Sequence, residues 1–266
     1  MSTSFDPGRV QLSLTILDGV VVAAEVACVR PEVARMLRGQ SADKVMALVP
    51  LIYSLCGKAQ GIAARAALAA ARGEAIDPHV DADALAEAAR EHAWKLFVDW
   101  PKQLGIAPDE AYFVRLVRAL PSERAGAAES LRAHPLPAAL SAALGEGEID
   151  GLLRERIDMR LAQLADWLAG KAQALGTVSA SSVGPGIGEA KVETARGTLV
   201  HRLTLADDAL ADYTIIAPTD VHFAPTGQVA GWLEKLRGLP AGEAERQAAR
   251  LVMAFDPCVP WDCTTR

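Results

Sequence analysis

Residues 255–266 read FDPCVPWDCTTR. This stretch holds Cys258 and Cys263, and prolines on both sides of Cys258 restrict the backbone and would present its thiol in one orientation. Two cysteines five residues apart at this place are unusual. One interpretation is a rigid turn anchored by Trp261, and the other is a segment that ligates a metal or takes part in redox chemistry.

The composition is that of an ordinary globular chain. The 266 residues carry a net charge of -6 and no block of Lys and Arg, so we expect no nucleic-acid partner. The first residues lack the features of a signal peptide, and Lys58 and Arg65 interrupt the most apolar stretch, 46–71, which fits a buried helix better than a membrane span. We therefore expect a cytoplasmic protein with no membrane association, folded as one domain over residues 1–266, whose cysteines are thiols.

The first part of the chain predicts a β-hairpin. Residues 10–14 alternate between polar and apolar side chains, Asp18-Gly19 marks a turn, and residues 20–28 form an apolar, β-branched run. Cys28 would then be an ordinary strand residue. Helical spacing and breakers predict helices after it, over residues 31–37, from about 41 with an interruption at Pro50, and over 58–72, 81–104, 108–120, 121–134 and 149–174.

Composition changes at Gly176. Residues 177–188 are rich in Ser and Gly and predict an exposed loop. Strands are expected over 190–193, 198–206 and 213–217, and helices over 228–238 and 241–255. The order of elements predicts an α+β fold, a helical bundle with an N-terminal β-hairpin and a small C-terminal sheet.

Three other short segments carry chemical groups. Cys56-Gly57 precedes a predicted helix, where free N–H groups and the helix dipole stabilise a thiolate. Arg196-Gly197 places a guanidinium at a tight turn, in a segment that begins with Glu193 and ends with His201. Pro218-Thr219 offers one hydroxyl at the end of a strand. Taken singly, each segment also fits a structural role.

In this order the four segments resemble the large subunit of nickel–iron hydrogenases. That family has Cys-Gly-x-Cys, then Glu-x-x-Arg-Gly with a His soon after, then Pro-Thr or Pro-Ser, and finally Asp-Pro-Cys-x-x-Cys. The matching residues here are Cys56-Gly57, Glu193, Arg196-Gly197, His201, Pro218-Thr219 and Asp256-Pro257-Cys258. The resemblance spans nearly the whole chain and implies a large-subunit-like fold.

Several family residues are missing. The second N-terminal cysteine, the His that follows it and the second C-terminal cysteine are replaced here by Ala59, Ala63 and Trp261. In the family the lost cysteines bridge nickel and iron, whereas Cys56 and Cys258 match the pair that ligates nickel terminally. The resemblance therefore implies that this chain has no stable bimetallic site, no nickel and no enzymatic activity.

The retained residues suit an iron unit that carries diatomic ligands. In the family, the Arg of the Arg-Gly motif and the hydroxyl of the Pro-Thr motif flank the cyanide ligands of iron. The corresponding residues here are Arg196 and, in the pair Pro218-Thr219, Thr219. Charged and hydroxyl donors suit cyanide nitrogens, and thiolates suit low-valent iron. This combination resembles the hydrogenase accessory proteins of the HupK/HoxV type. It implies a maturation scaffold that binds Fe(CN)2(CO) transiently through Cys56 and Cys258.

The same resemblance implies the partners. A HypC-type hydrogenase chaperone would deliver or collect the iron unit, and the precursor of the hydrogenase large subunit would receive it. Two alternatives stay open. The chain is a divergent catalytic subunit that uses Cys263 as a displaced ligand, or a regulatory or structural relative that binds a hydrogenase partner without metal.

Three supporting residues have two interpretations each. Asp256 matches an acidic residue close to the family's active site, but it also fits the cap of a helix end or a turn. His201 is either a ligand or a strand residue with satisfied hydrogen bonds. Glu193 is expected to pair with Arg196 or to orient it.

Overall fold

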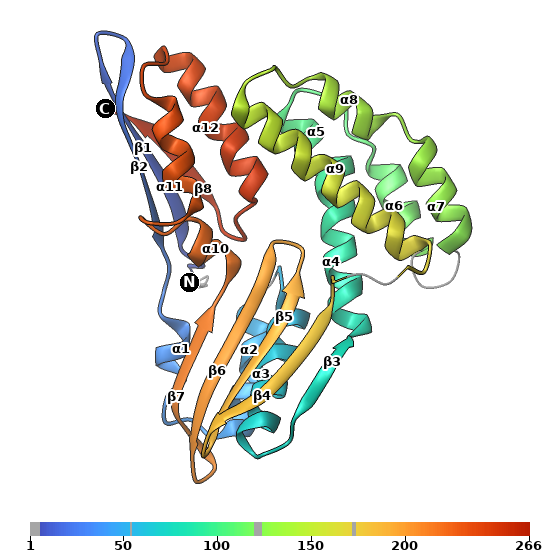
Figure 1. Ribbon diagram of the computed structural model, residues 1–266, viewed down its shortest axis with the longest axis vertical. Coiled ribbons are helices and arrows are strands. Elements are labelled where there is room, and N and C mark those ends of the chain that lie inside the picture. The colour runs from blue at the N-terminus through green and yellow to red at the C-terminus, as the bar shows by residue number, and fades with distance from the viewer. Residues whose placement is uncertain (1–5, 54, 120–123, 172–173) are drawn as a thin grey trace, which may run out of the picture.

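The computed structural model describes residues 6–53, 55–119, 124–171 and 174–266. Within them the chain forms two sheets and a group of helices, arranged as Figure 1 shows. One sheet has the strand order β2-β1-β8 and the other β3-β4-β5-β6-β7. The predicted α+β class, with a hairpin, a helical region and a C-terminal sheet, is confirmed.

The N-terminal hairpin consists of β1 (Arg9–Leu17) and β2 (Val20–Val29) in antiparallel register. The turn residues Asp18 and Gly19 both have positive φ, of 51° and 82°, as a tight two-residue hairpin turn requires. The hairpin was predicted, and Cys28 lies in β2 as expected.

The C-terminal tail contains a strand that the sequence analysis, with its interpretation of a rigid turn, did not predict. Residues Trp261–Thr265 form β8, which pairs in parallel with β1 so that Val10 lies beside Trp261 and Leu12 beside Cys263. A strand of five residues needs an existing sheet edge, and here that edge lies about 250 residues away along the chain, where no local pattern can indicate it. Because Cys258 precedes β8 by three residues, this pairing ties its segment to the hairpin.

The five-stranded sheet carries α2 (Ala42–Ile52) and α3 (Gly57–Ala71) on one side (Figure 1). The prediction of a loop over residues 177–188 is wrong, because these residues form all of β4 (Thr177–Gly184) and the start of β5 (Ile187–Thr194). Small residues are present there because α3 packs closely on the sheet: a Cβ at Gly188 would lie 1.9 Å from the carbonyl oxygen of Ala67. The strands are β3 (Ile76–Val80), which was not predicted, β4 (Thr177–Gly184), β5 (Ile187–Thr194), β6 (Gly197–Ala206) and β7 (Ala209–Ile216).

The helical region follows the predicted order. The helix predicted over 81–104 is continuous but contains one π-helical turn, η1 (Lys95–Asp99), between α4 (Ala82–Trp94) and α5 (Trp100–Gln103). Helix α8 was not predicted, α9 ends earlier than expected, and the boundary predicted between residues 120 and 121 lies outside the described residues. The other helices here are α6 (Glu110–Ala119), α7 (Arg124–Ala133), α8 (Leu136–Ala142) and α9 (Glu148–Leu168).

The remaining helices lead back to the hairpin. They are the short α1 (Val33–Met36), α10 (Pro218–His222), α11 (Gln228–Leu233), the 3-10 turn η2 (Glu234–Leu236) and α12 (Ala241–Phe255). In Figure 1, α11 and α12 lie beside the sheet of β1, β2 and β8. Among the described residues, none of the helices has the length and apolar character needed to cross a bilayer.

The close contact between α3 and β5 gives a stability prediction. We expect Gly188→Ala to lower the free energy of unfolding by roughly 1–3 kcal/mol, because the new methyl group meets backbone atoms of Ala67 and Ala71 that cannot move independently of α3. Gly151→Ala, within α9, is the matched control: nothing lies within 4 Å of its Cβ, and we expect a change of up to about 1 kcal/mol towards higher stability. Denaturant unfolding measures both, and equal stabilities would contradict the close packing.

Candidate metal centre at two distant cysteines

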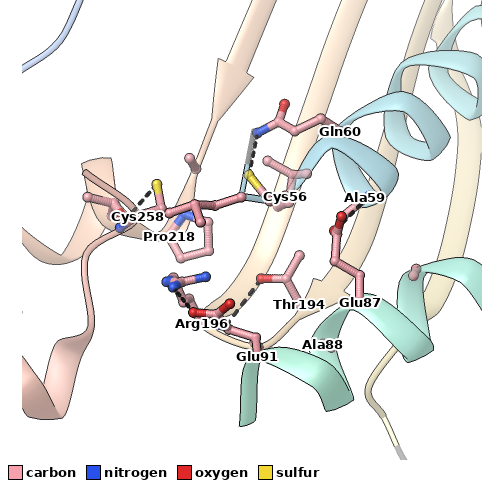
Figure 2. Close-up of a pocket in the computed structure, with 16 residues that line it drawn as sticks. Cys56, Ala59, Gln60, Glu87, Ala88, Glu91, Thr194, Arg196, Pro218 and Cys258 are labelled. Carbon is pink, nitrogen blue, oxygen red and sulfur yellow. Dashed lines mark hydrogen bonds and ion pairs between the residues drawn. The ribbon is translucent and has the colours of Figure 1, made fainter. Parts of the chain in front are cut away.

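Cys56 and Cys258 come together at one pocket. Cys56 precedes the first residue of α3, and Cys258 lies three residues beyond the end of α12. Figure 2 shows them with Gln60, Pro218 and the other residues that line the pocket. Both are free thiols, and their side chains are close enough to share a hydrogen bond.

The two thiols have opposite electrostatic environments. The hydrogen bond from Cys56 lowers the pKa of Cys258 and outweighs the effect of burial, and the cation of Arg30 and the hydroxyl of Thr219 lower it further. The same hydrogen bond, together with burial, raises the pKa of Cys56 well above its ordinary value. The pair therefore loses its first proton more readily than two ordinary thiols would, and the donor Thr219 and the cation of Arg30 favour Cys258 as the site of the negative charge.

Thr219 fixes the position of Cys258. It lies in the first turn of α10, directly after Pro218, and its side chain is buried. Its Oγ1 accepts a hydrogen bond from the backbone N–H of Cys258 at 3.1 Å, and its hydroxyl donates to Cys258 Sγ at 3.3 Å. The predicted hydroxyl is thus present at the pocket, and its first contact is the sulfur itself.

Asp256 anchors the segment that carries Cys258. Its backbone is left-handed (φ 49°) at the end of α12, and the residue is 2% exposed. Its carboxylate contacts three cations: Lys95 Nζ at 2.7 Å, Arg160 Nη2 at 2.8 Å and Arg196 Nε at 3.3 Å. Burial alone would raise the pKa of Asp256, but the arginines and the lysine lower it by more, so the carboxyl stays ionised. Asp256 is the C-cap residue of α12, as one interpretation expected, and it does not line the pocket, so its role as a site residue stays a prediction.

Arg196 lies in the turn between β5 and β6 and joins Asp256 to the helical region. Its Nε donates to the Asp256 carbonyl oxygen at 2.7 Å, and its Nη2 forms an ion pair with Glu91 of α4. Sequence analysis missed Glu91 and Lys95. The signal that could have found them is their spacing of four residues, which places two opposite charges on one face of an otherwise alanine-rich helix.

Three predicted residues are not part of the pocket wall. Cys263 lies in β8 opposite Leu12 and packs against the core. Glu193 was expected to pair with Arg196, but its carboxylate accepts a hydrogen bond from Thr198 instead. His201 is fully buried between Gln60 and Tyr213 and is a strand residue with both ring nitrogens bonded.

The donor set fits a metal that brings ligands of its own. Among the described residues, no group of three or more His, Cys, Asp or Glu side chains is placed to enclose a metal ion. Cys56 and Cys258 thus offer two sulfur ligands and leave the other coordination positions open. A closed structural metal site, which needs about four protein ligands, does not fit this arrangement.

The thiol pair gives a titration prediction. We expect the ultraviolet absorbance of the wild-type protein to show one thiolate already at neutral pH, because only the lowered pKa of Cys258 favours the charged form there. Cys258→Ser should remove it. Cys28→Ser and Cys263→Ser should leave it unchanged, because burial raises the pKa of both thiols, that of Cys28 to about 11. A neutral-pH thiolate that persists in Cys258→Ser would contradict the assignment.

The ion cluster gives a second stability prediction. We expect Asp256→Asn to cost roughly 3–5 kcal/mol at neutral pH, because the buried Arg160 and the half-buried Lys95 and Arg196 lose their shared carboxylate. Because the pKa of Asp256 is lowered in the folded protein, the wild-type advantage should be complete at neutral pH and be lost only as pH falls into strong acid. Asp208→Asn, which breaks the exposed pair with Arg72, should cost at most about 1 kcal/mol. If the unfolding curves of Asp256→Asn and Asp208→Asn coincide, the prediction is contradicted.

Comparisons with known proteins are consistent with this geometry. No family model matches the chain. The hydrogenase expression/formation protein HupK of Rhodobacter capsulatus is 30% identical over 294 residues, which cover 94% of this chain and 92% of the relative. HupK of Azotobacter vinelandii is 27% identical, with 96% and 98% covered. HoxV of Cupriavidus necator is 26% identical, with 87% and 90% covered.

Solved structures show which fold this is. The Ni-Fe-Se hydrogenase of D. vulgaris Hildenborough superposes with a TM-score of 0.62 at 13% identity, over 91% of this chain and 94% of that one. A NAD+-reducing NiFe-hydrogenase superposes with a TM-score of 0.54 at 14% identity. At such identities the likeness concerns the fold alone. The chain therefore belongs to the HupK/HoxV/HupV family of hydrogenase expression/formation proteins and has the fold of the NiFe-hydrogenase large subunit.

Proposed function

We propose that this protein is a cytoplasmic maturation scaffold that holds Fe(CN)2(CO) at Cys56 and Cys258 and passes it to the precursor of a hydrogenase large subunit. The observation that carries the proposal is the pair of sulfur atoms, brought from distant parts of the chain and placed in one pocket, where the described residues form no group of three or more His, Cys, Asp or Glu side chains that could enclose a metal ion. Membership in a family of hydrogenase expression/formation proteins supports a role in hydrogenase maturation. A HypC-type chaperone is the proposed donor or acceptor of the unit.

The two sulfur atoms suit this cargo. Thiolates are soft ligands that bind low-valent iron well. Because the surroundings of Cys258 favour its thiolate, the main proton to be lost when iron binds is that of Cys56. Because cyanide and carbon monoxide occupy the other positions on iron, two protein ligands are enough to hold it.

The pocket wall suits the diatomic ligands. Arg196 borders the pocket, and its Nε and Nη2 are used by Asp256 and Glu91. The described residues supply no acceptor for Nη1, which leaves charged N–H donors for a cyanide nitrogen. Much of the rest of the wall, including Ala59, Ala88 and Leu199, is apolar and suits carbon monoxide.

Loading requires a local opening. The pocket has a cavity of about 30 Å³, and a second cavity of about 40 Å³ lies beside both cysteines near Tyr53 and Val259. Each has room for only a few waters, which is less than an iron atom with three ligands needs. Leu55, which borders both cavities and is 47% exposed, is the side chain best placed to move outward.

The start of α3 explains why we expect neither nickel nor catalysis. Ala59 and Ala63 are buried, and Glu87 accepts the backbone N–H groups of Lys58 and Ala59 at 2.9 and 3.1 Å. This carboxylate satisfies the N–H groups at the start of the helix. Because Ala59 stands where a second cysteine would be needed, no second thiolate is present there to bridge two metals. Cys263, the displaced ligand of a catalytic alternative, lies in β8 away from the pocket wall, which disfavours that alternative.

The test is infrared spectroscopy with metal analysis on protein purified from cells with active hydrogenase maturation. We expect iron, bands of cyanide and carbon monoxide, and no stoichiometric nickel. Cys56→Ala and Cys258→Ala should each abolish the bands. Cys28→Ala and Cys263→Ala serve as matched cysteine controls and should keep them.

Two results would count against the scaffold. Absence of both kinds of band under full iron supply would remove the proposed cargo and leave a regulatory or structural relative as the explanation. Equal loss of the bands in Cys263→Ala and Cys56→Ala would mean that the tail rearranges and that the assigned ligand pair is wrong.

A further inference from the structure

A chain of buried hydrogen bonds lies behind Cys56. Gln60, His201 and Tyr213 are at most 1% exposed. The hydroxyl of Tyr213 lies 2.7 Å from His201 Nδ1, His201 Nε2 lies 2.8 Å from Gln60 Oε1, and Gln60 Nε2 lies 3.8 Å from Cys56 Sγ. The chain runs from β7 through β6 and α3 to the pocket, where Figure 2 shows Gln60 turned toward Cys56.

The chemistry of the groups sets the direction of every bond. Gln60 Oε1 can only accept, so His201 must carry its proton on Nε2 and donate it. His201 Nδ1 is then an acceptor and takes the hydroxyl proton of Tyr213. Burial lowers the pKa of His201 to about 3, so the ring is neutral at physiological pH. All donors therefore point along the chain towards the sulfur of Cys56.

This direction matters when a metal is bound. Cys258 has donors of its own, the hydroxyl of Thr219 and the nearby cation of Arg30. Cys56 loses its thiol proton to become a ligand, and its sulfur then carries negative charge in a half-buried position. Among the described residues, Gln60 supplies the side-chain N–H group that faces this sulfur. Without His201, the Gln60 amide would be free to turn its oxygen towards the thiolate, which repels it.

We propose that Gln60, oriented by His201 and Tyr213, is a positioning residue that presents an N–H donor to the Cys56 thiolate and thereby strengthens metal binding at the Cys56–Cys258 pair. Where the metal is the iron unit, the proposal rests on the proposed function. The three residues act through Cys56 and do not contact the metal. Groups behind a metal ligand typically contribute 10–100-fold to metal affinity.

The test uses Co2+ and the whole apo-protein, without the maturation machinery. Binding is followed by the charge-transfer absorbance between sulfur and Co2+, and Cys56→Ala should abolish it. We expect Gln60→Leu and His201→Leu to weaken binding by roughly 10–100-fold, and Tyr213→Phe by less. His201→Gln should bind Co2+ with an affinity close to that of the wild type, because the new amide can donate to Gln60 and accept from Tyr213.

A matched control comes from the other buried histidine. His92 Nε2 lies 2.9 Å from Gln163 Oε1, so Gln163→Leu removes a hydrogen bond of the same type that does not reach Cys56. Arg160 still donates to His92 Nδ1 at 3.0 Å and keeps its ion pair with Asp256, so the segment of Cys258 stays anchored in this variant. We expect its Co2+ affinity to stay at the wild-type value. Thermal unfolding of each variant separates loss of fold from loss of affinity. If a leucine variant fails to fold, Tyr213→Phe and His201→Gln still test the positioning role.

A second readout uses protein that carries the iron unit. A hydrogen bond to a thiolate reduces its electron donation to the metal, so Gln60→Leu should move the carbonyl band to lower wavenumber, and Gln163→Leu should not. Unchanged affinity and an unchanged band in Gln60→Leu and His201→Leu would overturn the positioning role. Equal weakening by Gln163→Leu would also overturn it, because loss of any amide bonded to a buried histidine would then be the cause.

The two proposals can fail separately. Co2+ binding that depends on Gln60, in protein that never carries cyanide or carbonyl bands, would refute the iron scaffold and support the positioning role. Bands of the iron unit that neither shift nor weaken in Gln60→Leu would support the iron scaffold and refute the positioning role. A wild-type protein that binds neither Co2+ nor the iron unit through Cys56 would overturn both.

Discussion

The buried carboxylate of Asp256 holds together three parts of the chain that are far apart in sequence. It contacts Lys95 in η1, Arg160 in α9 and Arg196 in the β5–β6 turn, while its own left-handed backbone ends α12. Removing a charge partner from such a cluster is costly, because the remaining ions stay buried without compensation. The direction of the chain after α12, and so the place of Cys258, depends on this one group.

Two further contacts complete the position of Cys258. Thr219 bonds both its backbone N–H and its sulfur, and β8 pairs with β1 just beyond it. On the other side of the pocket, α3 places Cys56 and is held against the second sheet by close helix–strand packing. The two sulfur atoms are thus carried by different parts of the fold. A small displacement of either part would open the pair, which suits the release of the iron unit in the proposed function.

The sequence alone predicted much of the fold and several residues of the candidate site. Alternation and the Asp18-Gly19 turn predicted the hairpin, helical spacing predicted the long helices, and the four motif segments indicated Cys56, Cys258, Arg196 and Thr219. These signals are local, because periodicity and turn chemistry are read within a few residues. The Ser- and Gly-rich stretch 177–188 failed as a predictor, because small residues favour a loop in solution but also permit a strand under a closely packed helix.

The tertiary structure decided which groups surround the two sulfur atoms. Glu91 and Lys95 join Arg196 and Asp256, and Gln60 beside Cys56 meets His201, through contacts between residues 60 to 161 positions apart. No local pattern reports such pairs, because a helix residue shows its spacing along the helix but not the partner that its face will meet. The sequence therefore determined that two cysteines are available, and packing decided which donor faces each sulfur, Thr219 at Cys258 and Gln60 at Cys56.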